Sequence, residues 1–298
     1  MDVFREIYAY LPGDIADALK ERMPPGICEI RLTVNRPILV SDGLHTAIFT
    51  PGNGRRLVIT KDILEGIMTR LTGGSIYSVS DHLAEGYITL TGGHRVGVMG
   101  TAVVRGNGIS HIRQISAINF RISREVRGCC LPIVNELETC GRIANILIAS
   151  PPGCGKTTYL RDLCRIISNG ELSCGIRRVG IADERGEIAA VKDGIPGYDV
   201  GVGSFVCDGY PKALAMMAML RSMSPDVIAT DEIGTREDFD ALAKALCCGV
   251  SVIATAHAGD LCDLKRRFEN ELNSFDKIVL LKERGRVSRI YRRGENGY

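Results

Sequence analysis

The sequence predicts an α/β domain with a parallel sheet over residues 136–298, preceded by a smaller α+β domain over residues 1–135. A chain of 298 residues is long enough to form two separate cores. In the first part, apolar and polar residues alternate as they do in half-buried strands. After Gly141, short and nearly continuous apolar runs alternate with helical patterns, as expected for strands that helices cover on both faces. We therefore place the boundary within residues 124–141.

Local patterns predict the elements of the N-terminal part. Residues 12–23 predict a short helix. Residues 60–74 predict a second helix, because Thr60 can cap its start, its apolar residues follow a helical period and glycines end it. Alternation on either side of a Gly-Gly pair in residues 86–104 predicts a β-hairpin. The other expected strands are residues 27–34, 36–43 and 45–50.

Strands and helices alternate along the C-terminal part. This order predicts a parallel sheet with right-handed crossovers. The expected strands are residues 144–150, 177–183, 226–232, 251–258 and 277–283, and the expected helices are residues 156–168, 210–223 and 235–249.

Composition and charge argue against several classes of protein. Hydrophobic residues make up 45% of the chain and charged residues 24%, which argues against long disordered segments. A net charge of +2 predicts neither a nucleic-acid footprint nor a polybasic membrane patch. The first residues are charged where a signal peptide is apolar, and no apolar run is long enough to span a membrane. The eleven cysteines lack C-x-x-C spacing, so we expect most of them to be buried thiols.

The strongest motif lies between the first strand of the second domain and the helix that follows. It contains Pro151, Pro152, Gly153, Cys154, Gly155, Lys156, Thr157 and Thr158. The glycines let backbone N–H groups turn toward phosphate, Lys156 can reach the β and γ oxygens, and Thr157 can offer its hydroxyl to Mg²⁺. Ser150 stands where this motif usually begins with glycine, and Cys154 is either an oxidation-sensitive thiol or a small neutral filler. The motif predicts a site for ATP and Mg²⁺.

Acidic residues end two of the predicted strands. Asp231 and Glu232 stand at the carboxyl end of residues 226–232, where ligands bind in such sheets. Asp231 would hold Mg²⁺ through water, and Glu232 would be the general base toward the attacking water. The alternative is an acidic pair that caps the next helix. Asp183 and Glu184 end another strand, either as groups that support the attacking water from behind its direct partners or as part of a solvated turn.

Histidine and arginine side chains complete the candidate site. His257 ends the strand after the acidic one, where it could sense hydrolysis or orient water beside the γ-phosphate. A structural histidine is the alternative. Phosphoryl transfer also needs positive charge on its transition state, and Arg113, Arg121 and Arg124 precede the nucleotide domain. For any one of these arginines, an ordinary basic strand face is the simpler interpretation.

Together these motifs resemble those of RecA-type secretion ATPases, the superfamily of type II secretion and type IV pilus motors. The resemblance rests on residues 150–158, 183–188, 220–234 and 255–260. It implies a RecA-like P-loop NTPase domain that hydrolyses ATP.

Residues 29–40 and 208–234 resemble, more specifically, the stage III sporulation protein AA family. This resemblance covers nearly the whole chain. It implies an ATPase of endospore-forming bacteria that works in the mother cell as the motor of a secretion-like complex with membrane-embedded subunits. Two positions depart from the pattern: Asp231 stands where most secretion motors have glycine, and residues 203–205 lack an expected charged triplet.

We therefore expect a homo-oligomeric, hexameric ATPase on the cytoplasmic face of a membrane, with N-terminal arginines completing its sites. No nucleic-acid partner is expected. The alternative is a nucleic-acid-dependent RecA-type ATPase, although the near-neutral charge supplies no footprint for it. A third hypothesis is a nucleotide-gated scaffold that scarcely hydrolyses ATP, against which the presence of Glu232 argues.

Overall fold

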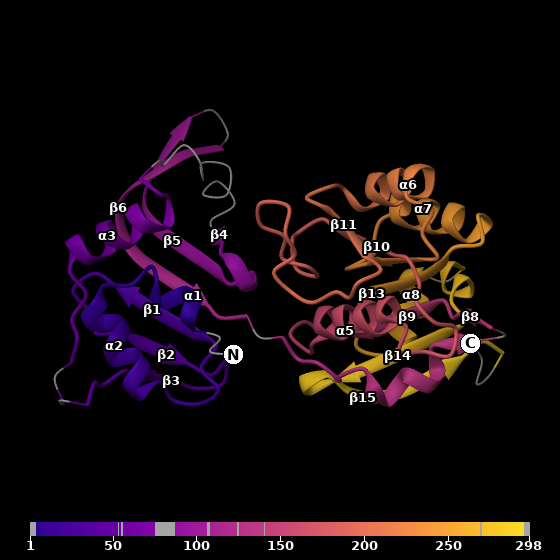
Figure 1. Ribbon diagram of the computed structural model, residues 1–298, viewed down its shortest axis with the longest axis horizontal. Coiled ribbons are helices and arrows are strands. Elements are labelled where there is room, and N and C mark those ends of the chain that lie inside the picture. The colour runs from indigo at the N-terminus through magenta and orange to yellow at the C-terminus, as the bar shows by residue number, and fades with distance from the viewer. Residues whose placement is uncertain are drawn as a thin grey trace. The chain divides into compact units, whose positions relative to one another are not determined.

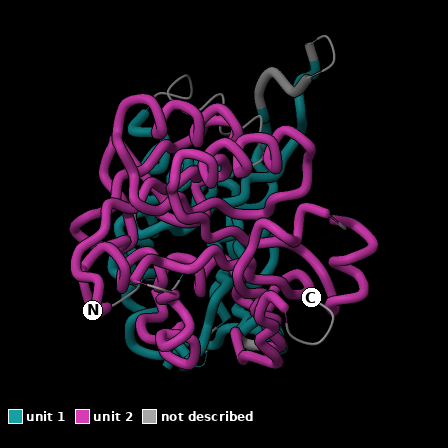
Figure 2. Tube along the Cα trace, turned by 90° about the vertical axis from the view of Figure 1, so that its right-hand side faces the viewer, with its two compact units in different colours: residues 1–124 teal, residues 125–298 magenta. Residues whose placement is uncertain are grey.

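The computed structural model of this protein divides into two compact units, residues 1–124 and residues 125–298 (Figure 2). The structure describes residues 4–52, 54, 56–74, 87–105, 108–123, 125–139, 141–268 and 270–294.

The first unit contains a six-stranded antiparallel sheet with the order β3-β2-β1-β6-β5-β4 (Figure 1). Its elements are α1 (Arg5–Tyr8), α2 (Gly13–Arg22), β1 (Glu29–Thr33), β2 (Leu39–Ser41), β3 (Thr46–Ile48), α3 (Lys61–Leu71), β4 (Tyr87–Thr89), the 3₁₀ turn η2 (Thr91–Gly93), β5 (Arg95–Arg105) and β6 (Gly108–Arg121). Each helix and strand expected in this part is present.

Local chemistry explains the ends of these elements. Thr60 caps α3, because its hydroxyl accepts a hydrogen bond from the N–H of Ile63 at 3.3 Å. Between β4 and β5, Gly92 and Gly93 have φ angles of 75° and 73°, which glycine adopts without steric cost. On β6, Ile118 and Phe120 are fully buried, and they pack in one core with Leu64 and Ile67 of α3. The predicted cap and hairpin are confirmed.

The units divide between residues 124 and 125, at the start of the segment in which we expected the boundary and before the predicted residue 135. The reason is packing. Cys130, Ile133 and Leu137 are fully buried in a core of the second unit. Glu136 also forms ion pairs with Lys277 and Arg292 of that unit, at 3.0 and 2.5 Å.

The second unit contains a seven-stranded sheet with the order β11-β10-β12-β13-β9-β14-β15. All neighbouring strands are parallel except β14 and β15. Its elements are η3 (Leu131–Glu136), β7 (Glu138–Thr139), β8 (Arg142–Ile143), β9 (Ile146–Ser150), α5 (Lys156–Asn169), β10 (Val179–Asp183), β11 (Ser204–Asp208), α6 (Lys212–Ser222), β12 (Val227–Thr230), α7 (Arg236–Cys247), β13 (Ser251–His257), α8 (Leu261–Phe268), η4 (Glu271–Ser274), β14 (Lys277–Lys282), η5 (Glu283–Gly285) and β15 (Arg286–Arg292). The predicted parallel sheet is confirmed, with β11, β15 and α8 in addition.

Helices cover both faces of this sheet (Figure 1). Ile146 and Ile148 of β9 pack in one core with α5. Leu147 and Ala149, which point to the opposite face, pack in the core formed with α6, α7 and α8. Because β9, β10, β12 and β13 are parallel, their carboxyl ends meet at one edge of the sheet, where ligands bind in open α/β folds.

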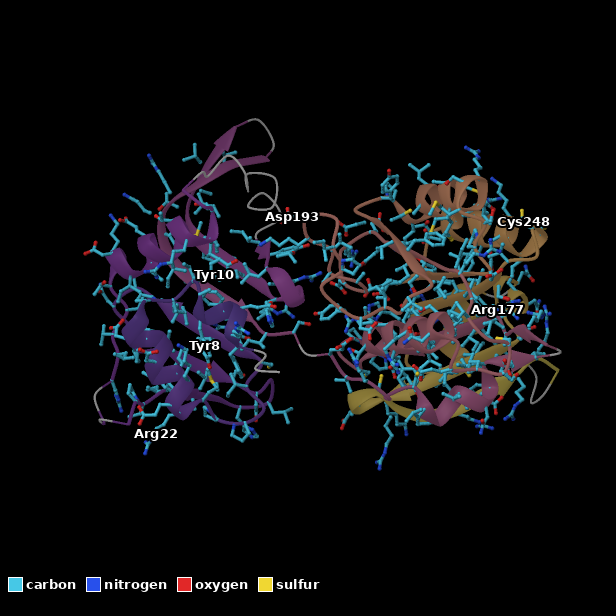
Figure 3. The ribbon with its side chains drawn as sticks, in the orientation of Figure 1. Tyr8, Tyr10, Arg22, Arg177, Asp193 and Cys248 are labelled. Carbon is cyan, nitrogen blue, oxygen red and sulfur yellow. The ribbon has the colours of Figure 1, made fainter. Side chains whose placement is uncertain are left out.

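Side chains fill the space between the elements of each unit (Figure 3). The ten cysteines that the structure describes are free thiols. Cys130 and Cys164 are buried, whereas Cys247, Cys248 and Cys262 are exposed, so the expectation that most cysteines are buried is wrong. Cys248 caps the end of α7, where the helix meets solvent.

Among the described residues, no helix combines the length and the apolar character needed to cross a membrane.

Candidate functional site

A glycine-containing loop connects β9 to α5 at the carboxyl edge of the parallel sheet. Gly153 and Gly155 have φ angles of 73° and 90°, and no atom lies within 4 Å of a β-carbon built at Gly153. The N–H of Gly285 in η5 braces the loop by donating a hydrogen bond to the carbonyl of Cys154 at 2.8 Å. Ser150 fits at the strand end, because its buried hydroxyl donates to the carbonyl of Pro151 at 2.8 Å.

Thr157, in the first turn of α5, lies next to the acidic residue at the end of β12. Its hydroxyl donates a 2.7 Å hydrogen bond to Oδ2 of Asp231, and the hydroxyl of Thr255 on β13 donates to Oδ1. Burial raises the pKa of Asp231, although both hydroxyl hydrogen bonds act in the opposite direction. A hydroxyl and a carboxylate are the oxygen donors that Mg²⁺ prefers, so this pair fits the predicted cation.

His257, at the end of β13, connects the loop lysine to the second acidic residue. Nζ of Lys156 lies 3.0 Å from Nδ1 of His257, and Nε2 lies 2.8 Å from Oε1 of Glu232. Because an ammonium can only donate, Nδ1 accepts and the ring proton lies on Nε2, which donates to Glu232. The three side chains form a continuous hydrogen-bonded chain from the phosphate loop to the candidate base.

Burial and charge alter the acidity of both ends of this chain. Lys156 is only 5% exposed, and burial lowers the pKa of its ammonium despite the nearby charges of Asp231 and Glu232. Burial by itself would raise the pKa of Glu232. The hydrogen bond from His257 and the charge of Arg185 outweigh burial, so the pKa of Glu232 lies below its ordinary value. The candidate base is therefore ionised at neutral pH.

Three further residues contact Glu232 or its neighbour and were not expected from the sequence. Nη1 of Arg185 lies 2.9 Å from Oε2 of Glu232, and Nζ of Lys212 donates to the carbonyl of Glu232 at 3.0 Å. The third is Thr255, whose hydroxyl also accepts from the N–H of Glu232 at 2.9 Å. Thr255 precedes His257 by two residues and so points to the same face of β13, a signal that sequence reasoning could have used.

Asp183, at the end of β10, holds the loop that follows it. Its carboxylate accepts hydrogen bonds from the backbone N–H groups of Glu187, Ile188 and Ala189, at 2.8 to 3.2 Å. Arg161 of α5 donates to the carbonyls of the same loop. Asp183 therefore holds residues 184–189, which we call the Asp183 loop, and its expected role toward the attacking water stays a prediction. Glu184 lies in this loop and pairs with Lys212 at 3.2 Å.

The arginines expected to assist phosphoryl transfer belong to the first unit. Arg113 and Arg121 are exposed residues of β6. Arg124 lies outside the described residues. Their role toward a nucleotide stays a prediction.

Comparison with known proteins shows the family to which this chain belongs. A model of the family described as "Sporulation stage III, protein AA" matches residues 2–296. The chain is 39% identical over 303 residues to stage III sporulation protein AA of Bacillus subtilis (strain 168), and the match covers 98% of this chain and 96% of that protein. The chain belongs to the stage III sporulation protein AA family. The family that the sequence motifs resembled is thus confirmed.

Two solved structures show the fold of this member of the stage III sporulation protein AA family. The ATPase DotB of Legionella pneumophila matches with a TM-score of 0.57 at 15% identity, over 91% of this chain and 76% of DotB. The pilus retraction motor PilT with bound ADP matches with a TM-score of 0.56 at 17% identity, over 90% of this chain and 76% of PilT. The likeness confirms the predicted RecA-like P-loop fold, which this chain shares with DotB and PilT.

Proposed function

We propose that this chain binds ATP with Mg²⁺ at the loop after β9, hydrolyses it, and works as the motor of a secretion-like complex in endospore formation. One observation carries the proposal. The chain Lys156–His257–Glu232 and the pair Thr157–Asp231 lie at the same edge of a parallel sheet. This is the arrangement that positions a phosphate, a cation and a general base together.

The loop provides the binding chemistry. Backbone N–H groups and the amino end of α5 attract the phosphates, and Lys156 pairs with the β and γ oxygens after releasing His257. Mg²⁺, held by the Thr157 hydroxyl and through water by Asp231, would neutralise charge on the phosphate oxygens.

Glu232 is the general base of the proposal. Its carboxylate, which is ionised at neutral pH because its pKa is lowered, accepts the proton of the attacking water. His257 connects this step to binding: when Lys156 turns to a phosphate, Nδ1 of His257 loses its donor and becomes available to the γ-phosphate or its water. The hydrogen bonds of His257, and through them those of Glu232, would therefore depend on whether a nucleotide is bound.

We further propose that the chain forms a homo-oligomer, a hexameric ring, at the cytoplasmic face of a membrane. Arg113 and Arg121 of one subunit complete the site of its neighbour, and membrane-embedded subunits receive the motion. Two findings support the motor. The chain matches a sporulation protein over nearly its full length, and PilT, which shares its fold, is described as a retraction motor. No nucleic acid takes part, in keeping with the net charge of +2.

The test is ATP turnover by the purified chain over a series of protein concentrations, with light scattering for mass. We expect turnover per subunit to rise as oligomers form and to be unaffected by single-stranded DNA.

Glu232→Gln should reduce kcat by about 100-fold or more while nucleotide affinity is retained. Lys156→Ala should abolish nucleotide binding. Unchanged turnover of Glu232→Gln would remove the base assignment. Turnover that is flat with concentration but climbs with DNA would favour the nucleic-acid-dependent ATPase.

A further inference from the structure

The backbone of Glu232 has an unusual conformation. Its φ angle is 46°, in the left-handed region that a β-carbon disfavours. Non-glycine residues keep such a conformation only where their surroundings hold it, and they are frequent at functional sites. A general base must also be held within a narrow range of positions to act. The groups that hold this peptide therefore bear on the proposed reaction.

Hydrogen bonds from two sides hold the backbone of Glu232. Its N–H donates to Oδ1 of Asp231 at 3.0 Å and to the hydroxyl of Thr255 at 2.9 Å, both at the edge of the sheet. Its carbonyl accepts from Nζ of Lys212, which stands at the first position of α6. The N–H is thus held by the sheet, and the carbonyl is held by a helix that follows a different strand.

Lys212 is placed for this contact. Its side chain is 13% exposed, and a buried ammonium is costly unless it is paired. The carboxylate of Glu184, on the Asp183 loop, lies 3.2 Å from Nζ and balances the charge. The Asp183 loop is in turn held by Asp183 and by Arg161 of α5, the helix that begins at Lys156. The lysine is therefore oriented by a loop attached to the phosphate-binding helix.

We propose that Lys212 is a positioning residue for Glu232, and that Glu184 orients Lys212. By holding the carbonyl of residue 232, Lys212 keeps the backbone at positive φ and aims the carboxylate at the attacking water. The proposal rests on the proposed function of Glu232. It gives Glu184, which the sequence left open between a group supporting the water and a solvated turn, a role toward a lysine.

The experiment uses the full chain and measures kcat, KM and nucleotide affinity. Lys212→Met should reduce kcat by about 10- to 100-fold, because a displacement near 1 Å is enough for such a loss. KM and nucleotide affinity should stay within about twofold, since Lys212 contacts the base rather than the phosphate loop. Lys212→Arg, which keeps the charge, should recover most of the rate. Lys244→Met, an exposed lysine of α7, is the matched control and should behave as the wild type.

A double-mutant cycle tests whether Lys212 acts through Glu232. Adding Lys212→Met to Glu232→Gln should change turnover by less than about twofold, because the base is already absent. Two full, additive losses would overturn the proposal. A wild-type kcat in Lys212→Met, together with a reduced kcat in Glu232→Gln, would also overturn the proposed role of Lys212. The proposed function would remain intact in that case.

Thermal unfolding provides a readout that does not depend on turnover. Glycine adopts positive φ more readily than alanine, so Glu232→Gly should unfold about 2 °C above Glu232→Ala. If Lys212 imposes the conformation, this difference should vanish when both are combined with Lys212→Met. A difference that persists would mean that Lys212 does not hold the backbone. If Glu232→Gln instead hydrolyses ATP at the wild-type rate, the assignment of Glu232 as the base fails, and this comparison still decides whether Lys212 holds the backbone of residue 232.

Discussion

Asp183 ends strand β10 and Asp231 follows the neighbouring parallel strand β12, and yet they bind different kinds of partner. Asp183 accepts from three backbone N–H groups of the loop that follows it. Asp231 accepts one backbone N–H, that of Glu232, and also the hydroxyls of Thr157 and Thr255, on the phosphate-binding helix and on β13. Backbone N–H donors fix a carboxylate to the loop that they belong to. Hydroxyl donors from other elements can rotate away, and the carboxylate can then bind a cation in their place. Asp183 is therefore a carboxylate that builds the site, whereas Asp231 is one that is available for chemistry.

The largest effect that sharpens this comparison is expected at Asp231. Asp231→Asn should reduce Mg²⁺-dependent ATP turnover by about 100-fold, because the charge that would hold the cation is lost. The unfolding temperature should not fall. Burial raises the pKa of Asp231, so the fold already favours a neutral side chain there. Steady-state turnover and calorimetry measure the two quantities. A large fall in unfolding temperature with turnover intact would mean that Asp231 stabilises the fold and does not hold the cation.

Asp183→Asn should have the opposite effect to Asp231→Asn: the stability of the fold should decrease. We expect the free energy of unfolding to fall by about 2 to 3 kcal/mol, because hydrogen bonds to a charged acceptor are replaced by weaker ones. The measurement is urea unfolding, with nucleotide affinity determined on the folded chain. Asp193→Asn, at an exposed position labelled in Figure 3, is the control. If both variants lose the same stability, Asp183 does not hold its loop.

Arg185 allows a test of how the Asp183 loop affects the base. Its charge helps to keep the pKa of Glu232 low, after the larger effect of the hydrogen bond from His257. Arg185→Gln should therefore raise the pKa of Glu232 and move the acid limb of the pH–rate profile to higher pH. The profile of kcat against pH is the readout, with Arg236→Gln on α7 as the control. An acid limb at its wild-type position would show that Arg185 does not influence the base.

The smallest effect is expected at Glu136, a carboxylate whose partners are cations. The hydrogen bond from Arg292, helped by Lys277, lowers its pKa to about 2 from an ordinary value of 4.5. A lowered pKa adds stability that is complete above pH 4.5 and is lost as the pH falls toward 2. Because solvent screens the pair, Glu136→Gln should cost about 1 kcal/mol at pH 7. The cost in urea unfolding should shrink at pH 3, and an equal cost at both pH values would contradict the ion-pair explanation.

Much of the second unit was predictable because its elements carry strong local signals. Fully buried strands such as β9 and β13 are continuous apolar runs, and the loop before α5 is marked by Gly153 and Gly155. The missed strands lack such runs. β11 is half-buried at one edge of the sheet, and β15 is largely exposed at the other, so neither needs an apolar sequence.

By itself, the sequence determined which residues stand at the ends of the parallel strands, and so which of them meet at one edge of the sheet. Asp231, Glu232 and His257 were identified in this way, because strand direction brings carboxyl ends together whatever the packing in between. Lys156 and Thr157 were identified from the glycine-containing motif that follows β9. Only the tertiary structure decided what each carboxylate binds. The N–H groups that hold Asp183 depend on how its loop folds back. The ammonium that holds the carbonyl of Glu232 comes from α6, whose position is set by packing against the sheet rather than by any local pattern.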